Sequence, residues 1–439
     1  MNNPDFNAEV VILAGGFGSR LTQVIGDNIP KPMALINGKP LLEYQVDLCV
    51  EHGFKKILIL LHYRPEVVMD YFENGDSFGA DIRYSIESVP RGTAGAIYDS
   101  LDLVADSFLV IYGDTFLDVN LRKFFNAKAS VDSVLTFCHP NSHPFDSDLL
   151  TLDANGKVEK VFRPSISGDQ HYRNLVNAAL YVINKEAISK YVSATSQMDI
   201  SSELFPMMIA RGEFIQTYIS PEYIKDMGTP DRYQVINRQV QEGIPSLLSD
   251  KEKRRCVFLD RDGVINLEVG HLSSVDDFEL LKNVPKAIAL LNAAGYLVIC
   301  VTNQPVLARG ELTENGLSLI HMKMEAELGK EGAYLDNIYQ CPHHPEKGFP
   351  GEITELKIKC ECRKPNPGML LQAIEDFKID PSLSWIIGDH MRDISAGKAV
   401  GARTILVGSD SNAENENQSL VDYRFDSLLP ACEWILKSR

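Results

Sequence analysis

The sequence predicts an α/β fold in two domains, each with alternating strands and helices. Short apolar runs with strand-like composition recur along the chain, at residues 10–14, 56–61, 108–112, 257–259, 296–301 and 385–387. Segments with helix-like patterns lie between such runs, at residues 41–52, 284–294 and 316–328. This alternation is typical of domains built on largely parallel sheets.

A domain boundary is predicted near residues 241–255, QEGIPSLLSDKEKRR. Gly and Pro there are followed by polar and charged residues, and then by a new apolar strand, CVFLD. Because this restart mirrors the opening run VVILAGG, a linker fits better than a loop within one domain. We expect a first domain at residues 1–240, a linker at 241–255 and a second domain at 256–439.

Composition limits the classes of partner. The chain has 439 residues and a net charge of -17, because 60 Asp and Glu outnumber 43 Lys and Arg. A chain this acidic has no general reason to bind nucleic acid or an anionic membrane surface. It has no apolar run of the roughly 18 residues that a membrane helix needs, and its start does not resemble a secretory signal. We expect a cytoplasmic protein without nucleic-acid or membrane partners, and the sequence allows a homo-oligomer.

A glycine-rich turn, LAGGFGSRL at residues 13–21, directly follows the first apolar run. Small residues let backbone amides approach a phosphate chain closely. A Rossmann fingerprint that starts at Gly16 would need glycine where Leu21 stands, and a P-loop would need lysine after Gly18, which Ser-Arg follows. The turn alone therefore indicates either another kind of phosphate site or a tight turn without a ligand.

Together with Pro30-Lys31-Pro32-Met33, the turn resembles the opening signature of the sugar-1-phosphate nucleotidyltransferases. Four further matches follow in the order expected for that family: RGTAGA at 91–96, YGD at 112–114, NAA at 177–179 and KDMGTP at 225–230. The resemblance covers residues 8–240 and implies a Rossmann-like, GT-A-like domain with a mixed sheet. One segment departs from the family, because Phe162-Arg163-Pro164 stands where Glu-Lys-Pro is usual.

The same resemblance implies roles for individual residues. A sugar 1-phosphate oxygen attacks the α-phosphorus of a nucleoside triphosphate and pyrophosphate leaves, so positioning and charge neutralisation dominate. Arg20 and Lys31 would cradle the phosphates. Asp114 and Asp226 would hold Mg²⁺, which prefers carboxylate oxygens. The substrate contacts implied are Gly15, Gly16, Gly92 and Asn177; taken alone, Asp114 also fits a turn cap and Lys31 a solvated loop lysine.

A second set of chemical residues begins with Asp260-Arg261-Asp262-Gly263, directly after the strand VFL. Two carboxylates at this spacing can share Mg²⁺ while the first attacks phosphorus and the second donates and accepts a proton. Thr302 follows a later apolar run, Arg363-Lys364-Pro365 precedes a helix, and Gly388-Asp389 follows another strand with Asp393 one turn on.

These four parts resemble the haloacid dehalogenase-like phosphatases over residues 255–410, and they imply a parallel-sheet domain. By that resemblance Asp260, Asp262, Thr302 and Lys364 are catalytic. The implied Mg²⁺ ligands are Asp260, Asp262 and Asp389. The implied substrate contacts are Asn303, Arg363 and His390.

Three cysteines and one histidine cluster between Thr302 and Lys364, as Cys341-Pro342-His343 and Cys360-Glu361-Cys362. Cys₃His is a closed tetrahedral zinc set, and a disulfide is disfavoured in a reducing compartment. His344 is adjacent, but His343 fits the short C-x-H spacing better. We predict a structural Zn²⁺ that fixes the loop carrying Arg363 and Lys364.

The zinc-bearing arrangement resembles heptose-bisphosphate and histidinol-phosphate phosphatases. It departs from them at Pro305-Val306, where Ser-Gly is general, and at His390, where Lys or Arg is common. The opening segment resembles the D-glycero-α-D-manno-heptose 1-phosphate guanylyltransferases. The fusion therefore suggests dephosphorylation of a heptose 1,7-bisphosphate followed by guanylyl transfer from GTP, to give GDP-heptose.

Two other interpretations are open at this point. One is a nucleotidyltransferase for another hexose 1-phosphate, such as mannose 1-phosphate, joined to another sugar-phosphate or histidinol-phosphate phosphatase. The other is a second domain that serves as a scaffold without catalysis. The predicted small-molecule partners are a nucleoside triphosphate, with GTP favoured, and a sugar phosphate.

Overall fold

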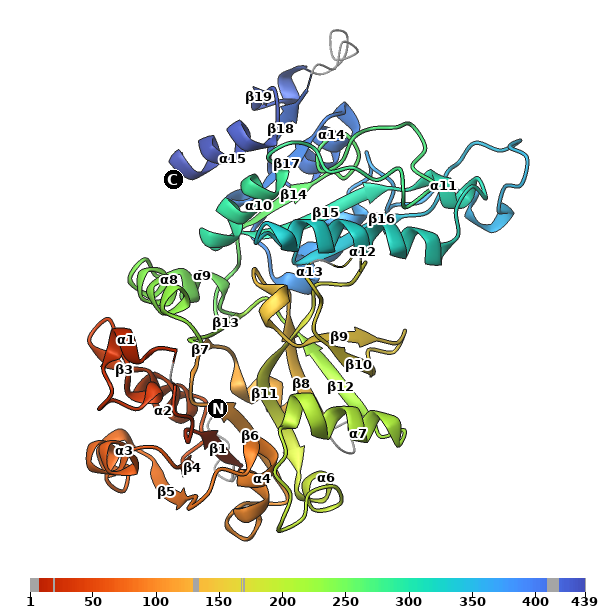
Figure 1. The fold of residues 1–439 in the computed structure, drawn as a ribbon. Helices are drawn as coiled ribbons and strands as arrows, with labels where there is room; N and C mark the ends of the chain where they lie inside the picture. Colours follow the sequence, from red (N-terminus) through yellow and green to blue (C-terminus); the bar gives the residue numbers. More distant parts are fainter. Residues whose placement is uncertain are drawn as a thin grey trace. The chain divides into compact units, whose positions relative to one another are not determined.

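The computed structural model describes residues 8–18, 20–128, 134–166, 168, 170–408 and 418–438. The chain divides into two compact units (Figure 1). Unit 1 comprises Met1–His139, Asp148–Arg163 and Leu175–Ser249, and unit 2 comprises Pro140–Ser147, Pro164–Asn174 and Asp250–Arg439. Within the described ranges, no helix is both long and apolar enough to cross a membrane.

Unit 1 is built on a mixed sheet, to which nine strands contribute among the described residues. β1 (Glu9–Leu13) lies between β4 (Lys56–Leu61) and β6 (Ser107–Tyr112), and both neighbours run parallel to it. β11 (Val176–Asn184) runs antiparallel to β6. The other strands are β5 (Asp81–Ile86), β8 (Val134–His139), β9 (Leu149–Leu152), β10 (Val158–Phe162) and β12 (Ile215–Ile219).

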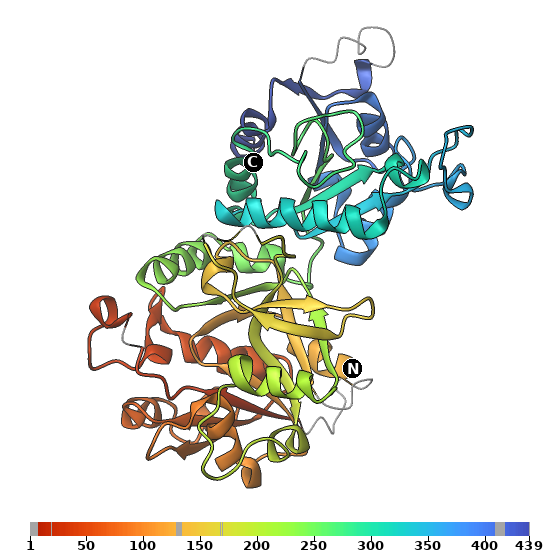
Figure 2. The ribbon, with the colours of Figure 1, turned by 45° about the vertical axis from the view of Figure 1, so that its right-hand side comes forward.

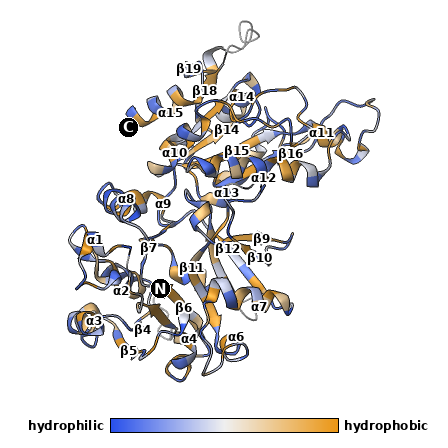
Figure 3. Cartoon of the chain, in the orientation of Figure 1, coloured by the Kyte–Doolittle hydropathy of each residue, from blue (hydrophilic) through white to orange (hydrophobic). Residues whose placement is uncertain are grey.

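Helices cover both faces of this sheet because alternate strand residues bury apolar side chains on opposite sides. Val10 and Ile12 of β1 belong to one buried core, and Val11 belongs to the other. Figure 3 shows this apolar character along the strands. The helices of unit 1 up to residue 210 are α1 (Thr22–Ile25), α2 (Leu41–Glu51), α3 (Pro65–Phe72), α4 (Gly92–Asp99), α5 (Leu121–Ala127), α6 (Lys185–Ser189) and α7 (Phe205–Ala210).

Two short strand pairs and two helices complete unit 1. β7 (Thr115–Asp118) pairs with β13 (Tyr223–Asp226), and β2 (Leu35–Ile36) pairs with β3 (Lys39–Pro40). The helices that follow are α8 (Pro230–Gln241) and α9 (Ile244–Leu248). The segment predicted as a linker thus contains a helix, because Ile244 and Leu248 are buried instead of solvated.

Unit 2 is built on a parallel sheet of six strands among the described residues, in the order β16-β15-β14-β17-β18-β19. Chain order reverses at β14, and ligands of such sheets bind at the carboxyl ends of the strands beside that point. The strands are β14 (Cys256–Leu259), β15 (Leu297–Asn303), β16 (Asn337–Cys341), β17 (Trp385–Gly388), β18 (Arg403–Val407) and β19 (Tyr423–Phe425).

Helices also flank this second sheet. α10 (Val284–Ala293), α12 (Glu314–Lys330) and α15 (Leu428–Lys437) share one buried core with β14. α12 runs alongside the sheet in both views of the ribbon (Figures 1 and 2). The remaining helices are α11 (Pro305–Ala308), α13 (Gly368–Phe377) and α14 (Met391–Ala399). The predicted α/β class, with a mixed sheet in the N-terminal part of the chain and a parallel sheet in the C-terminal part, is confirmed.

Candidate active sites

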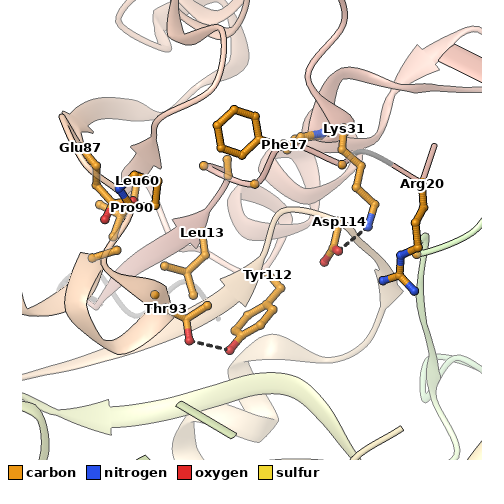
Figure 4. Close-up of a pocket in the computed structure, with 18 residues that line it drawn as sticks. Leu13, Phe17, Arg20, Lys31, Leu60, Glu87, Pro90, Thr93, Tyr112 and Asp114 are labelled. Atoms are coloured by element: carbon orange, nitrogen blue, oxygen red, sulfur yellow. Dashed lines mark hydrogen bonds and ion pairs between the residues drawn. The ribbon is translucent and has the colours of Figure 1, made fainter. Parts of the chain in front are cut away.

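The unit 1 cavity, of about 400 Å³, opens at the carboxyl ends of β1 and β6. Its walls include the glycine-rich turn after β1 and the charged residues Lys31, Glu87 and Asp114. Figure 4 shows Glu87 toward one end of the cavity, with Asp114 and Arg20 toward the other. The cavity therefore carries a carboxylate at one end, and a carboxylate together with cationic side chains at the other.

Two glycines of this cavity are required by their surroundings. Gly18 has φ +63°, and a Cβ there would lie 2.9 Å from the Cβ of Lys31. Gly92 has φ +74°, and its Cβ would lie 2.4 Å from the carbonyl oxygen of Met198. Gly16 has open space where a Cβ would stand, so its backbone faces the cavity without a steric barrier.

Asp114 lines the unit 1 cavity, and Asp226 ends β13 two residues before the lining residue Gly228. Lys31 Nζ donates to Asp114 Oδ2 at 2.5 Å (Figure 4), and Arg232 Nη1 donates to Asp226 Oδ1 at 2.6 Å. The β7–β13 pair sets Asp226 opposite Thr115, and the amide of Met227 donates to the carbonyl of Asp114 at 2.8 Å. Each carboxylate is ion-paired to a cationic side chain here, and carboxylate oxygens are also the ligands that Mg²⁺ prefers.

The other predicted residues of unit 1 differ in their placement. Arg20 is exposed and lines the cavity, as do Gly15, Gly16 and Gly92. Asn177 is buried in β11, where its amide accepts from Thr136 Oγ1 at 3.0 Å and donates to Ser201 Oγ at 2.9 Å. Among the described lining residues of the cavity Asn177 is absent, so a sugar contact through its side chain would need these bonds to change.

Glu87 is a cavity residue that the sequence analysis did not single out. One of its carboxylate oxygens accepts from the amide of Arg91 at 3.3 Å, and the other lies 3.4 Å from where a Gly15 Cβ would stand. Burial raises the pKa of Glu87, while the Arg91 amide and nearby cations oppose the rise. The carboxylate is therefore held against the glycine-rich turn.

In unit 2, the chemical residues follow three neighbouring strands. Asp260 comes after β14, Asn303 ends β15, and Asp389 comes after β17. Gly263 has φ +78°, and a Cβ there would lie 2.1 Å from Asp389 Oδ2. Only glycine lets the turn after β14 approach Asp389 this closely, which explains the glycine of the DRDG segment.

Lys364 lies in a buried network between two carboxylates. Its Nζ is 2.9 Å from Asp260 Oδ1 and 2.7 Å from Asp393 Oδ1, and it donates to the carbonyl of Val301 at 2.6 Å. Burial and the neighbouring Asp393 raise the pKa of Asp260, whereas Lys364 opposes the rise. This arrangement holds the Asp260 carboxylate at a fixed place with a compensating positive charge.

Asp262 has different partners. Arg261, which is fully buried, donates to Asp262 from Nη2 at 2.9 Å, and Gln304 donates from Nε2 at 2.9 Å. Burial tends to raise the pKa of Asp262, but Arg261 and the hydrogen bonds outweigh it and the net shift is downward. The two carboxylates therefore differ in environment, because Asp260 pairs with Lys364 and Asp262 pairs with Arg261 and Gln304.

Three carboxylates of unit 2 lie close enough together to bind one metal ion. They belong to Asp260, Asp389 and Asp393, and one oxygen of each lies within 4.8 Å of the others. Asp389 Oδ1 is buried and accepts no hydrogen bond from the described residues, as expected of an atom that binds a cation. The side chain of Asp262 is not grouped with them, since it bonds to Arg261, Asn266 and Gln304.

The remaining predicted residues of unit 2 surround the unit 2 cavity, of about 430 Å³. Asn303, Arg363 and His390 line it together with Asp260 and Asp262. Asn303 also exchanges two hydrogen bonds with the backbone of Lys364, both of 3.0 Å. Thr302 is buried, and its hydroxyl accepts from Gln304 Nε2 at 2.8 Å.

Cys341, His343, Cys360 and Cys362 come together in unit 2. The three sulfur–sulfur distances are 3.6, 3.2 and 3.3 Å, and His343 Nδ1 lies 3.3 Å from Cys362 Sγ. These separations are close to the edges of a tetrahedron with metal–sulfur distances of about 2.3 Å. His344 is not part of the group; its Nδ1 accepts from the amide of Glu346.

A family model described as nucleotidyl transferase matches residues 9–243, more than half of the chain. The chain belongs to the nucleotidyl transferase family. A second model, HAD-hydrolase-like, matches residues 361–431 of this nucleotidyl transferase.

Curated relatives match the back of the chain. The D-glycero-beta-D-manno-heptose-1,7-bisphosphate 7-phosphatase of Haemophilus ducreyi is 38% identical over 184 residues, which are 42% of this chain and 98% of the relative. The chain therefore also belongs to the family of these phosphatases. It is a bifunctional enzyme, with a nucleotidyltransferase in the N-terminal part of the chain and a phosphatase in the C-terminal part.

Two solved structures are also similar. HddC from Yersinia pseudotuberculosis, complexed with GMP-PN, is 26% identical with a TM-score of 0.46, and the match covers 53% of this chain and 99% of that one. The D,D-heptose 1.7-bisphosphate phosphatase from B. bronchiseptica, complexed with magnesium and phosphate, is 31% identical with a TM-score of 0.38. That match covers 42% of this chain and 99% of the other.

Sequence reasoning missed two residues that line the cavities, Glu87 and Gln304, and one that is buried beside Asp262, Arg261. Glu87 precedes the RGTAGA segment by only a few residues, Arg261 stands between the two aspartates, and Gln304 follows Asn303. Adjacency to a recognised motif was the available signal in each case. Asp393 was seen as part of a pattern, but its membership of the carboxylate cluster depends on the folded geometry.

Proposed function

We propose that the chain catalyses two consecutive reactions of GDP-heptose synthesis. The phosphatase removes the 7-phosphate from D-glycero-D-manno-heptose 1,7-bisphosphate, and the nucleotidyltransferase then joins heptose 1-phosphate to a guanylyl group from GTP. The phosphatase relatives, which are named for the bisphosphate, support the first substrate. The order follows because the phosphatase leaves a sugar 1-phosphate, the class of substrate that the transferase uses.

The position of Glu87 is the observation that carries the preference for GTP. Guanine presents two adjacent donors, N1–H and N2–H₂, which a carboxylate can accept with its two oxygens. Uracil and thymine present one donor between two carbonyl oxygens, so a carboxylate would face acceptors that repel it. A buried acceptor left without a donor is costly, which favours the matching base strongly.

In the transferase reaction, a phosphate oxygen of the sugar attacks the α-phosphorus of GTP as the bond to pyrophosphate breaks. The backbone of the glycine-rich turn, Arg20 and Lys31 would bind the phosphates. Asp114 and Asp226 would hold Mg²⁺, which would neutralise charge on the phosphates. In this arrangement Lys31 would exchange part of its contact with Asp114 for a phosphate oxygen.

In the phosphatase reaction, a carboxylate oxygen of Asp260 forms a bond to phosphorus as the bond to the sugar oxygen breaks. Asp262 gives a proton to the departing sugar oxygen and later takes one from the water that hydrolyses the aspartyl phosphate. Asp260, Asp389 and Asp393 would hold Mg²⁺, which supplies charge neutralisation at the phosphate. The Cys₃His cluster would hold Zn²⁺ and fix the loop that carries Arg363 and Lys364.

The experiment measures release of pyrophosphate from GTP, ATP, UTP or CTP, with heptose 1-phosphate or mannose 1-phosphate as the second substrate. We expect GTP to be preferred, and Glu87→Gln to lower kcat/KM for GTP by about 100-fold. Glu66→Gln, at an exposed position of α3, is the matched control and should behave as wild type. Equal use of UTP by the wild type would overturn the guanine assignment, and preference for mannose 1-phosphate would overturn the heptose assignment.

A further inference from the structure

Three arginines line the unit 2 cavity, and they differ in the hydrogen bonds and ring contacts that their guanidinium groups make with other residues. Arg309, Arg363 and Arg392 all reach this cavity, where Asp260 also lies. Asp260, Asp262 and Glu268 line the same cavity and offset part of this positive charge. A phosphate group beside Asp260 would still have guanidinium groups around it, in a chain whose net charge is -17.

The guanidinium groups of two of the three arginines contact other residues of the protein. Arg363 Nη1 donates to the carbonyl of His343 at 3.1 Å, which ties it to the Cys₃His cluster. Arg309 stacks over the ring of Phe349 at 4.7 Å, and its Nη1 lies 3.1 Å from Nδ1 of His271. Each of these contacts restricts the directions in which the guanidinium can donate.

Arg392 makes fewer contacts with the rest of the protein. It stands in the first turn of α14, three residues after Asp389. Its Nε, like that of Arg309, is buried with no hydrogen-bond partner among the described residues, but its guanidinium has neither the ring contact of Arg309 nor the hydrogen bond of Arg363. It lines the same cavity as Asp260 and Asp262. Arg392 is therefore the arginine whose donors are available near the carboxylate that receives the phosphoryl group.

His390 offers a different donor geometry. A guanidinium presents paired donors that match two phosphate oxygens, whereas an imidazole ring directs one nitrogen toward a single oxygen. His390 lines the same cavity, with its Nδ1 3.7 Å from Asp389 Oδ1. A cation at position 390 or at position 392 would therefore lie near the same phosphoryl group in this cavity.

We propose that Arg392 binds the phosphoryl group transferred to Asp260, by donating two N–H groups to its non-bridging oxygens. The position of the cation is thereby moved from residue 390, where the sequence analysis expected it, to residue 392. This inference rests on the phosphatase half of the proposed function. Arg392 changes no covalent bond; it neutralises charge on the phosphate before and during the transfer.

The test compares Arg392→Gln with wild type in hydrolysis of p-nitrophenyl phosphate and in competitive inhibition by inorganic phosphate. We expect kcat/KM to fall and the inhibition constant to rise, each by about 10- to 100-fold. Adding His390→Lys to Arg392→Gln should restore at least part of kcat/KM and of phosphate inhibition, because it returns a cation to the site of the phosphoryl group. A purely structural role of Arg392 would not be rescued in this way.

Arg424→Gln, at an exposed position of β19, is the control and should match wild type. Folding of each variant is followed by tryptophan fluorescence. If Arg392→Gln does not fold, Arg392→Lys is measured instead and should bind phosphate more weakly than wild type, since lysine lacks the paired donors.

Values within twofold of wild type for Arg392→Gln or its substitute, in both kinetics and phosphate inhibition, would overturn the inference. Calorimetric titration of wild type and variant with inorganic phosphate separates this failure from failure of the proposed function. A wild type that hydrolyses no phosphomonoester would contradict the phosphatase assignment, whereas equal phosphate binding by the two proteins would contradict the role of Arg392.

Discussion

The two cavities hold their charges in different ways. In unit 1 the side chains of Lys31 and Asp114 are 10% and 34% exposed, and Arg20 is exposed as well. In unit 2 the side chains of Lys364 and Asp393 are both 0% exposed. The first site is therefore completed by its charged substrates, whereas the second is assembled before any substrate binds.

This difference follows from the chemistry proposed for each site. Nucleotidyl transfer needs little covalent participation by the protein, so charges that close on a polyphosphate are sufficient. Formation of an aspartyl phosphate needs one carboxylate held at a fixed position, and a buried network supplies that position. Substitutions should therefore affect activity alone in unit 1, and both activity and folding in unit 2.

The largest expected effect is on activity and tests whether the two sites are separate. Asp260→Asn should lower phosphate release at least about 1000-fold, because it removes the nucleophile. It should leave unchanged the release of pyrophosphate from GTP when a sugar 1-phosphate is supplied. Asp114→Ala should do the reverse, with pyrophosphate release down about 100- to 1000-fold. Both activities are measured on each variant, and loss of both in a folded variant would contradict separate sites.

The next effect is on stability and tests the buried network directly. Lys364→Met leaves Asp260 and Asp393 buried without their cation, so we expect unit 2 to lose about 3–5 kcal/mol of unfolding free energy. Lys31→Met leaves an Asp114 that water reaches, so unit 1 should lose only about 0–1 kcal/mol.

Unfolding of unit 2 can be followed separately, since both tryptophans of the chain, Trp385 and Trp434, lie in it. Calorimetry of the whole chain reports both units, and the transition that tryptophan fluorescence does not follow is assigned to unit 1. Equal losses of stability in the two lysine variants would remove the distinction between the sites.

A smaller effect on activity is expected from substitution in the Cys₃His cluster. Cys360→Ser should reduce the zinc content of the purified protein and lower phosphatase activity about tenfold, because Arg363 and Lys364 follow the cluster directly. Glu361→Gln, between the two cysteines and exposed, should keep its zinc. Metal analysis before any chelator provides the measurement, and a zinc-free protein with full phosphatase activity would refute the assignment.

The smallest effect concerns pH. His321 of α12 accepts from Arg261 Nη1 at 3.3 Å, and burial followed by the Arg261 charge lowers its pKa to about 3. The unfolded chain binds a proton at this histidine below about pH 6.5 and the folded chain does not, so stability falls as pH falls through that range. The loss from this group is about 1.4 kcal/mol per pH unit below its unfolded pKa.

His321→Gln should therefore show a shallower loss of stability than wild type between about pH 6.5 and about pH 5. Urea unfolding followed by tryptophan fluorescence gives the two slopes. Identical slopes would mean that His321 is protonated in the folded chain as well, and that its contact with Arg261 does not persist.

The sequence predicted the elements that follow from periodicity and strand ends. The predicted strand 56–61 matches β4, and the predicted helix 41–52 differs from α2 by one residue. Asp260 and Asp389 each follow a strand, and strands of a parallel sheet bring their carboxyl ends to one edge. Their proximity could therefore be predicted without coordinates.

Side-chain direction could not be predicted in the same way. Asn177 turns its amide to Thr136 and Ser201, and Arg392 reaches a cavity, because of neighbours distant in sequence. The helix α9 within the expected linker likewise depends on burial of Ile244 and Leu248 against other elements. These features arise from tertiary packing, which local patterns do not contain.

The most direct test of the account is a single incubation of the enzyme with heptose 1,7-bisphosphate, GTP and Mg²⁺, followed by mass spectrometry of the products. We expect GDP-heptose without a 7-phosphate, with one phosphate and one pyrophosphate released for each molecule formed. A nucleotide sugar that retains the 7-phosphate would contradict the order of the two steps. Release of phosphate without any GDP-linked sugar would contradict the joint function.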